Sequence, residues 1–250
     1  MTYLKRPDIL EKAEYLPGLP VEEFIVPLLR QYIEDALTTC ATGAPLHSRA
    51  LDVGCGRQPF RKKLESIGYS YTSMDVHQSP EDTVDIICAI DEPLPLELTS
   101  CQPFHFVFCT EVMEHVADWD MAFKNLATLM EPGGRLLITC PHFYILHEEP
   151  YDFWRATPHA LRYFADRVGF KILYQETAGD AWDILGTLLA NCNPSPVSKT
   201  ILNRGITKLV RLSQQALFNL LLKRWLQKVV QLHGIYGRFY LSNIIVFEKI

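Results

Sequence analysis

The sequence has no long apolar run. None of its apolar stretches approaches the roughly 20 residues that a helix needs to span a bilayer. The first residues, Met1 to Asp8, also lack the apolar core of a secretory signal peptide. Because neither kind of segment is found, we expect the protein in the cytoplasm.

The seven cysteines form no recognisable pairing pattern. Their number is odd and no Cys-x-x-Cys pair occurs, which disfavours both a disulfide framework and a zinc site. Several of them lie in apolar, strand-like runs, where cysteine behaves as a small hydrophobic residue. We therefore predict reduced thiols, in agreement with a cytoplasmic setting.

Acidic residues are missing from one long segment. Between Ile184 and Phe247 the chain has no Asp or Glu but eight Lys or Arg, although the whole protein carries a net charge of −5. Three interpretations of this segment remain open. It caps the fold or forms a homodimer face, or it makes peripheral contact with an anionic membrane through residues 198–238, or it binds nucleic acid. The acidic remainder of the chain argues against nucleic acid.

Strand and helix patterns alternate from about Arg49, which favours an α/β fold with a mostly parallel sheet and helices on both faces. The predicted strands are Ala50–Val53, Tyr71–Val76, Val84–Ala89, His105–Thr110, Arg135–Cys140, Lys171–Glu176 and Asn243–Glu248. The predicted helices are Val21–Leu37, Phe60–Ser66, Met121–Leu129, Pro158–Val168 and Ile206–Leu232. We divide the chain into an N-terminal helical segment (1–45), a Rossmann-like domain (46–180), a basic amphipathic helical insertion (181–238) and a final strand (239–250).

A glycine-rich turn follows the first predicted strand, in the run Leu51-Asp52-Val53-Gly54-Cys55-Gly56. Glycine permits positive φ and lets a ligand approach the backbone, and the amides of a following helix suit a carboxylate. Asp52 is positioned to reach a ligand amine, directly or through water. A dinucleotide fingerprint requires a third glycine where this sequence has Pro59. The turn therefore favours a smaller, carboxylate-bearing ligand over a pyrophosphate.

Residues after the second and third strands continue this candidate cofactor site. Asp75 ends the second strand 19 residues after Gly56, where an acid accepts hydrogen bonds from both ribose hydroxyls. A solvated turn aspartate is the alternative for Asp75. Ile90 is our candidate for packing on an adenine face and Asp91 for its exocyclic amine, unless Asp91 is only a surface-loop acid. Val76, beside Asp75, joins the predicted set.

Together these residues resemble the class I methyltransferases that use S-adenosylmethionine (SAM), specifically the broad small-molecule group similar to type 11 methyltransferases. The resemblance covers about residues 48–178. The runs similar to family motifs are Leu51 to Gly56, Asp75, Cys109-Thr110-Glu111-Val112-Met113-Glu114-His115-Val116 and Glu131-Pro132-Gly133-Gly134-Arg135-Leu136-Leu137-Ile138. The resemblance implies SAM as cofactor on Gly54, Cys55 and Gly56, and a seven-stranded sheet whose last strand is antiparallel. Many relatives carry an acid where this chain has Ala89, and the minimal fold has no counterpart of residues 184–238.

Glu111, Glu114 and His115 follow the fourth strand, at the sheet edge where such folds bind ligands. If this segment is helical, Glu111 and His115 share a face. The family resemblance places Glu111 near the cofactor and makes the other two helix-start or packing residues. The Glu-x-x-Glu-His run is also similar to the metal-binding set of small-RNA terminal and ubiquinone-pathway O-methyltransferases, and it suits a hard cation. A third interpretation makes His115 a general base. We assign His115 as catalytic and assign no metal ligand.

The most unusual stretch follows the fifth strand, from Pro141 to His159, and holds three histidines among aromatic and charged residues. His142 is our preferred base, because it directly follows the strand end. The predicted acceptor contacts are Tyr144, His147, Glu148, Tyr151 and Arg155. The alternative is structural: the aromatic residues are core, His159 starts a helix, and Arg155 pairs with Asp152.

The sequence therefore predicts methyl transfer from SAM to a small-molecule acceptor at oxygen, nitrogen or carbon. Sugars, quinone precursors and lipid-linked intermediates remain open as acceptors. A base is not obligatory, because positioning alone lowers a barrier by about 7–11 kcal/mol. The alternatives are a metal-assisted RNA methyltransferase, a non-catalytic SAM-binding protein, and a nicotinamide oxidoreductase, which Pro59 disfavours.

Overall fold

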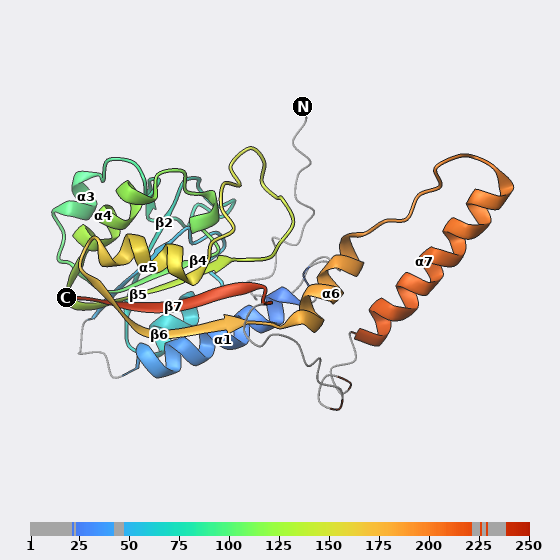
Figure 1. Ribbon diagram of the computed structural model, residues 1–250. Coiled ribbons are helices and arrows are strands. Elements are labelled where there is room, and N and C mark those ends of the chain that lie inside the picture. The colour runs from blue at the N-terminus through green and yellow to red at the C-terminus, as the bar shows by residue number, and fades with distance from the viewer. Residues whose placement is uncertain (1–21, 23, 43–47, 222–225, 227–228, 230–238) are drawn as a thin grey trace.

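The computed structural model describes residues 22, 24–42, 48–221, 226, 229 and 239–250. Within these residues a seven-stranded sheet has the order β3-β2-β1-β4-β5-β7-β6 (Figure 1). All pairings are parallel except those of β7, which runs antiparallel to β5 and β6. The strands are β1 (Arg49–Val53), β2 (Ser70–Asp75), β3 (Ile86–Ile87), β4 (Phe104–Thr110), β5 (Met130–Pro141), β6 (Phe170–Ala178) and β7 (Ser242–Lys249). This is the predicted fold class.

Helices cover both faces of the sheet (Figure 1). The helices are α1 (Ile25–Cys40), α2 (Arg61–Ser66), α3 (Leu96–Thr99), the 3₁₀ turn η3 (Met113–His115), α4 (Trp119–Leu129), α5 (Pro158–Asp166), α6 (Ala181–Asn191) and α7 (Ile201–Leu221). One core cluster joins α3, α4 and α5 to the sheet and contains Phe123 and Leu161. The other joins α1 and α2 to the opposite face and contains Ile33 and Phe106. Burial on both faces explains the continuous apolar runs of the central strands.

Two predicted strands differ from those observed. Val84–Ala89 is reduced to the two residues of β3, because this edge strand pairs with β2 only at Met74 and Asp75. β5 begins at Met130, earlier than predicted. A register shift between Phe104 and Phe106, together with a φ of 81° at Gly133, accommodates the predicted turn inside the strand.

Two helices are described in full between β6 and β7, where the sequence predicted a helical insertion. α6, which was not predicted as a separate helix, begins with a capping box: Asp180 accepts from the Asp183 amide, and Asp183 accepts from the Asp180 amide. α7 begins at Ile201, and most of the predicted extension to Leu232 lies outside the described residues. The four-part division remains a prediction, since residues 43–47 and most of 222–238 are not described. Among the described helices, none combines the length and apolar character that a transmembrane segment requires.

Candidate active site

The strand order reverses between β1 and β4, so the chain leaves these neighbouring strands towards opposite faces of the sheet. In open α/β sheets the crevice for a ligand lies at this point, outside the carboxyl ends of the strands. Gly54 follows β1, Asp75 ends β2, and Glu111 follows β4. The fold therefore brings three predicted site residues to one edge.

The glycine turn after β1 has the positive φ angles that the sequence led us to expect. Gly54 and Gly56 have φ values of 66° and 51°, in the left-handed region that favours glycine. A Cβ atom on Gly54 would clash with Cγ2 of Val112, whereas a Cβ on Gly56 would meet no atom of the described residues within 4 Å. Gly54 therefore allows close packing against the segment after β4, and Gly56 borders open space.

Asp75 is joined directly to this turn. The Gly56 amide donates to Oδ2 of Asp75 at 2.8 Å, and the His77 amide donates to Oδ1 at 3.3 Å. A carboxylate has about four lone-pair positions, so these two bonds leave acceptor capacity for the hydroxyls of a ligand. Val76, the next residue, is 53% exposed.

Asp52 is buried beneath the turn and accepts a hydrogen bond of 2.5 Å from the hydroxyl of Tyr71. Burial raises the pKa of Asp52 to about 7, although the Tyr71 bond opposes that shift. Cys55 is also buried, and burial raises the pKa of its thiol to about 12. Cys55 is therefore a neutral thiol at physiological pH, and only its backbone is suited to a ligand role.

The loop after β3 is fixed by a side chain that sequence analysis missed. The amide of Asn125 donates to the carbonyl groups of Ile90 and Glu92 at 2.7 and 2.8 Å. The side chain of Ile90 is buried in the core, and Asp91 accepts from the Asp118 amide at 3.3 Å. Roles for Ile90 and Asp91 towards an adenine ring remain predictions.

Arg57 was also missed, although it directly follows Gly56. Its Nε atom is buried and has no hydrogen-bond partner within the described part of the chain. A buried guanidinium nitrogen without an acceptor is costly unless a ligand supplies one. Its position directly after the second glycine of the turn is the sequence feature that could have identified Arg57 as a candidate.

Glu111 does not begin a helix. Its φ is 52°, its amide donates to the carbonyl and hydroxyl oxygens of Thr139, both at 3.1 Å, and its carboxylate accepts from Ser242 at 2.9 Å. Burial raises the pKa of Glu111, while the bonds from Thr139 and Ser242 oppose the shift. The predicted helical face shared by Glu111 and His115 is therefore wrong, since only the short turn η3 forms after the left-handed residue.

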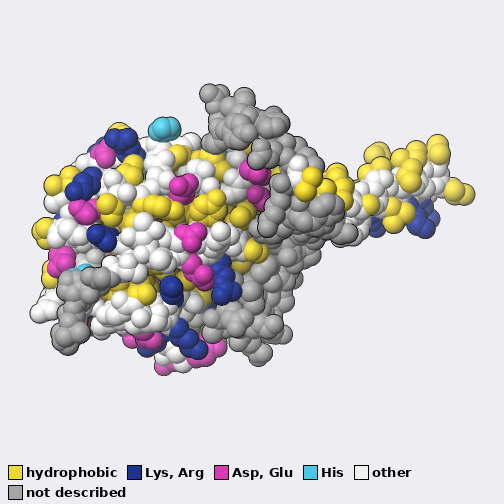
Figure 2. All heavy atoms as spheres, turned by 90° about the horizontal axis from the view of Figure 1, so that it is seen from below, with side chains coloured by type: hydrophobic (Ala, Val, Ile, Leu, Met, Phe, Trp, Pro, Cys, Tyr) yellow, Lys and Arg dark blue, Asp and Glu magenta, His cyan; other side chains and the backbone are white. Residues whose placement is uncertain are grey.

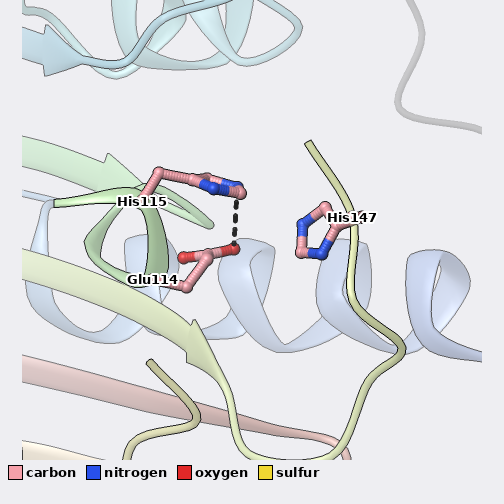
Figure 3. Close-up of side chains that lie close together, drawn as sticks. All are labelled: Glu114, His115 and His147. Atoms are coloured by element: carbon pink, nitrogen blue, oxygen red, sulfur yellow. Dashed lines mark ion pairs between the residues drawn. The ribbon is translucent and has the colours of Figure 1, made fainter. Parts of the chain in front are cut away.

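Glu114, His115 and His147 form a compact cluster, with one potential ligand atom from each residue within 4.8 Å of the others (Figure 3). Oε1 of Glu114 lies 3.7 Å from Nε2 of His115, while Oε2 is buried without a hydrogen-bond partner in the described structure. Burial raises the pKa of Glu114 well above its usual range. One carboxylate and two imidazoles suit a divalent transition metal. Glu111, which belonged to the predicted metal alternative, is not in this cluster, whereas His147 is.

Backbone carbonyl groups set the tautomers of the two histidines. Nδ1 of His115 lies 2.7 Å from the Tyr151 carbonyl oxygen, and Nδ1 of His147 lies 3.2 Å from that of Ile145. A carbonyl only accepts, so Nδ1 carries a hydrogen in each of these bonds, and in the neutral ring the lone pair is on Nε2, where a proton or a metal can bind. Burial lowers the pKa of His147, and the neighbouring His115 adds to the shift.

The loop after β5 is held together by Arg155. Its guanidinium donates to both carboxylate oxygens of Asp152, at 2.6 and 2.7 Å, and to the carbonyl groups of Tyr144 and Ile145. The predicted structural alternative, pairing of Arg155 with Asp152, is thus confirmed. Burial alone would raise the pKa of Asp152, but bonds from Arg155 and from the His147 amide lower it to about 2.

The remaining predicted acceptor residues lie in the same loop. The Tyr144 ring is 5.3 Å from that of His147, Glu148 lies 3.9 Å from Nε2 of His115, and Tyr151 is 61% exposed. Contact with an acceptor remains a prediction for all five of these residues, Arg155 included.

His142 lies in different surroundings from His115. Its ring stacks on Tyr240, with centroids 4.3 Å apart, and its Nδ1 lies 3.0 Å from the carbonyl oxygen of Ala156. Asn243 donates to the same carbonyl and to that of Cys140, both at 3.0 Å. Nε2 of His142 therefore keeps a lone pair. Tyr240 and Asn243 were missed because nothing nearby in the sequence links them to residue 142.

Comparison with known proteins identifies the class of protein. The chain belongs to a family of methyltransferase domains, whose model matches residues 27–175. The curated relatives include ubiquinone biosynthesis O-methyltransferases. The mitochondrial enzyme of Rattus norvegicus is 28% identical over 145 residues, which are 52% of this chain and 41% of the rat protein. That of Coxiella burnetii (strain RSA 493 / Nine Mile phase I) is 28% identical over 126 residues, 46% of this chain and 50% of its own length. The chain thus spans half or less of these relatives.

Solved structures share the fold. A putative sarcosine dimethylglycine methyltransferase from Galdieria sulphuraria aligns with a TM-score of 0.55 and 17% identity, over 96% of this chain and 93% of its own. A SAM dependent methyltransferase from Archaeoglobus fulgidus aligns with a TM-score of 0.53 and 14% identity, over 88% and 94% of the two chains. The predicted family and the predicted seven-stranded fold are both confirmed.

Proposed function

We propose that this chain transfers a methyl group from SAM to a small-molecule acceptor. The observation that carries the proposal is the turn at Gly54 and Gly56, where an exposed glycine backbone borders open space and hydrogen-bonds to the carboxylate of Asp75. When bound, SAM supplies a methyl group activated on a sulfonium. The Gly56 backbone and Asp75 would hold the ribose side, and Asp52 the amine.

The other end of the cofactor suits Arg57. A guanidinium with a buried, unpaired nitrogen is a strong partner for the carboxylate of an amino-acid group. Val76, Ile90 and Asp91 would border the adenine, and Glu111 would approach the cofactor from the carboxyl end of β4. This division leaves the loop after β5 for the acceptor.

We propose a hydroxyl oxygen of a planar, apolar acceptor such as a quinone precursor. The curated relatives are named as O-methyltransferases of ubiquinone biosynthesis. Tyr151, Phe153 and Trp154 expose 61%, 45% and 41% of their surface in the loop after β5, and aromatic side chains suit a flat ring. The RNA-methyltransferase alternative is not favoured, because these relatives act on small molecules.

His142 is the proposed base. Its Nδ1 hydrogen is directed to the Ala156 carbonyl, so Nε2 is free to take the proton of an acceptor hydroxyl. His115 has the same hydrogen bond from Nδ1 to a carbonyl and would be the base only if its Nε2 does not bind a cation.

We further propose that a divalent cation binds Glu114, His115 and His147. The cluster geometry supports it, and so does Oε2 of Glu114, which has no hydrogen-bond partner among the described residues. A cation there would place positive charge beside the loop after β5 and would stabilise an acceptor oxygen as it loses its proton.

The decisive experiment has two parts. Calorimetry should detect binding of S-adenosylhomocysteine and no binding of NAD. Incubation with radiolabelled SAM and a metabolite extract should then label a small molecule whose identification names the acceptor. Binding without any labelled product would leave a non-catalytic SAM-binding protein, and no binding would reject the proposed function. The cytoplasmic location and the homodimer remain predictions.

A further inference from the structure

α7 carries an apolar face that nothing in the described structure covers. Of its residues only Phe218 and Leu221 are buried. Leu202, Ile206 and Leu209 are 71%, 54% and 66% exposed, and Ile201, Val210, Leu212, Leu217 and Leu220 are exposed as well. In Figure 2 the helix extends from the body of the molecule as an arm that bears hydrophobic and basic side chains. A solvent-exposed helix with this many apolar residues indicates a binding surface.

The two kinds of side chain lie on opposite sides of the helix. At 3.6 residues per turn, Leu202, Ile206 and Leu209 fall on one face. Arg204, Lys208 and Arg211 fall on the other. The apolar face is therefore continuous along the helix and is not interrupted by charge.

The helix is attached to the body by its C-terminal part. Phe218 packs edge-on against Phe24 of the segment before α1, with ring centroids 5.8 Å apart. The indole of Trp182 in α6 donates to the Leu221 carbonyl at 3.3 Å, and Gln214 donates to the carbonyl of Leu189 at 2.5 Å. These contacts use a third side of the helix, so the apolar face stays outside.

Charge decides which partner fits this face. Every charged side chain between Ile184 and Phe247 is basic. A second copy of the helix, paired through the apolar face, would offer no acidic partner to the basic side. An anionic lipid surface complements the charge, and an apolar half with a basic opposite side is the arrangement of helices that lie in a membrane interface.

We propose that α7 is a peripheral anchor on anionic membranes. Its apolar face enters the boundary between headgroups and acyl chains, while the long side chains of Arg204 and Lys208 reach lipid phosphates. This inference does not rest on the proposed function, because it concerns a surface outside the candidate active site and is tested without methyl transfer.

The test is sedimentation of the full chain with vesicles of phosphatidylcholine, alone or mixed with phosphatidylglycerol. We expect binding to the mixed vesicles that weakens as salt is raised, and little binding to the neutral ones. The double variant Arg204→Gln/Lys208→Gln should bind about thirtyfold more weakly, from the contribution of each basic residue near an anionic surface. Lys62→Gln/Lys124→Gln removes two exposed charges elsewhere and should bind as the wild type does.

A second pair of variants tests the apolar face. Leu209→Asp should weaken vesicle binding more than about tenfold, because it places a charge where a leucine would be inserted into the membrane. Leu96→Asp changes a 79% exposed leucine in α3 and should have no effect. Circular dichroism checks that each variant is folded, which the exposure of these positions leads us to expect.

Several results would overturn the proposal. They are no sedimentation with either vesicle, equal binding to neutral and anionic vesicles, and equal losses in the variants and their matched controls. Sedimentation equilibrium that shows a dimer disrupted by Leu209→Asp would assign the face to a second copy. A gel shift of RNA abolished by Arg204→Gln/Lys208→Gln, without vesicle binding, would assign it to nucleic acid.

Discussion

The two halves of the sheet's carboxyl edge are built differently. On the β1–β2 side, the backbone makes the site: glycine conformations shape the turn, and Asp75 bonds to an amide 19 residues before it. On the β4–β5 side, side chains make the site, and their partners are distant in sequence. Ser242 bonds to Glu111 across 131 residues, and Asn243 to Cys140 across 103.

The two halves also differ in how much of each lies within the family match. The family match covers residues 27–175 and so includes the glycine turn, Glu111 and the loop after β5, but not β7. Tyr240, Ser242 and Asn243, which support His142 and Glu111, lie beyond it. The β1–β2 half therefore lies wholly within the family match, whereas the β4–β5 half also depends on residues that follow α7.

The largest expected effect separates the two halves by function. His142→Ala should lower turnover by about 10²–10⁴-fold, because it removes the proposed base. Affinity for S-adenosylhomocysteine should be unchanged, because His142 contacts Tyr240 and Ala156 on the other half. Single-turnover kinetics and calorimetry measure the two quantities. His159→Ala, at an exposed position in α5, is the matched control. Wild-type turnover in His142→Ala would remove it as the base.

The next variant tests the β1–β2 half, where the backbone of the glycine turn forms the site. Asp75→Ala should lower affinity for S-adenosylhomocysteine by about 100-fold, since hydrogen bonds to a charged group contribute about 1.5–3 kcal/mol each. Glu81→Ala, an exposed acid after the same strand, should bind normally. Calorimetry provides the affinity and circular dichroism the fold. Undiminished affinity in a folded Asp75→Ala would exclude the ribose role.

Cation binding tests the β4–β5 half without a measurement of methyl transfer. Calorimetric titration with Mn²⁺ should show one site, and Glu114→Gln or His147→Ala should weaken binding by about 10–100-fold through loss of one ligand. Glu111→Gln should bind Mn²⁺ normally, because its carboxylate is bonded to Ser242 and not in the cluster. If Mn²⁺ binds equally well to Glu114→Gln, the cluster is not a metal site.

The sequence could predict more of the β1–β2 half than of the β4–β5 half. Periodicity predicted all seven strands. The sequence also predicted the glycine turn and Asp75 at one site, and the structure joins them by a hydrogen bond that was not predicted. These features depend on residues close in the chain. The hydrogen bonds of His115 and His142 and the approach of Glu114 to His147 depend on how separate loops fold back. The Arg155–Asp152 pair, three residues apart in one loop, was among the predicted alternatives. The helical face expected for Glu111 and His115 failed because a positive φ at Glu111 follows from bonds to Thr139 and Ser242.

The smallest expected effect is a difference between the two glycines of the turn. Gly54→Ala should destabilise the fold by about 3 kcal/mol, since its methyl group would meet Val112 and its φ is left-handed. Gly56→Ala has the same strain but open space beside it, so about 1 kcal/mol is expected. Urea unfolding measures both.

Binding should rank the same two variants in the opposite sense to stability. The Gly56→Ala methyl group would project into the space that we assign to the cofactor, so this more stable variant should lose more affinity for S-adenosylhomocysteine than folded Gly54→Ala does. If Gly56→Ala binds as tightly as the wild type, the open space beside Gly56 is not where the cofactor lies, and the backbone-built half loses its proposed role even if Asp75 keeps its own.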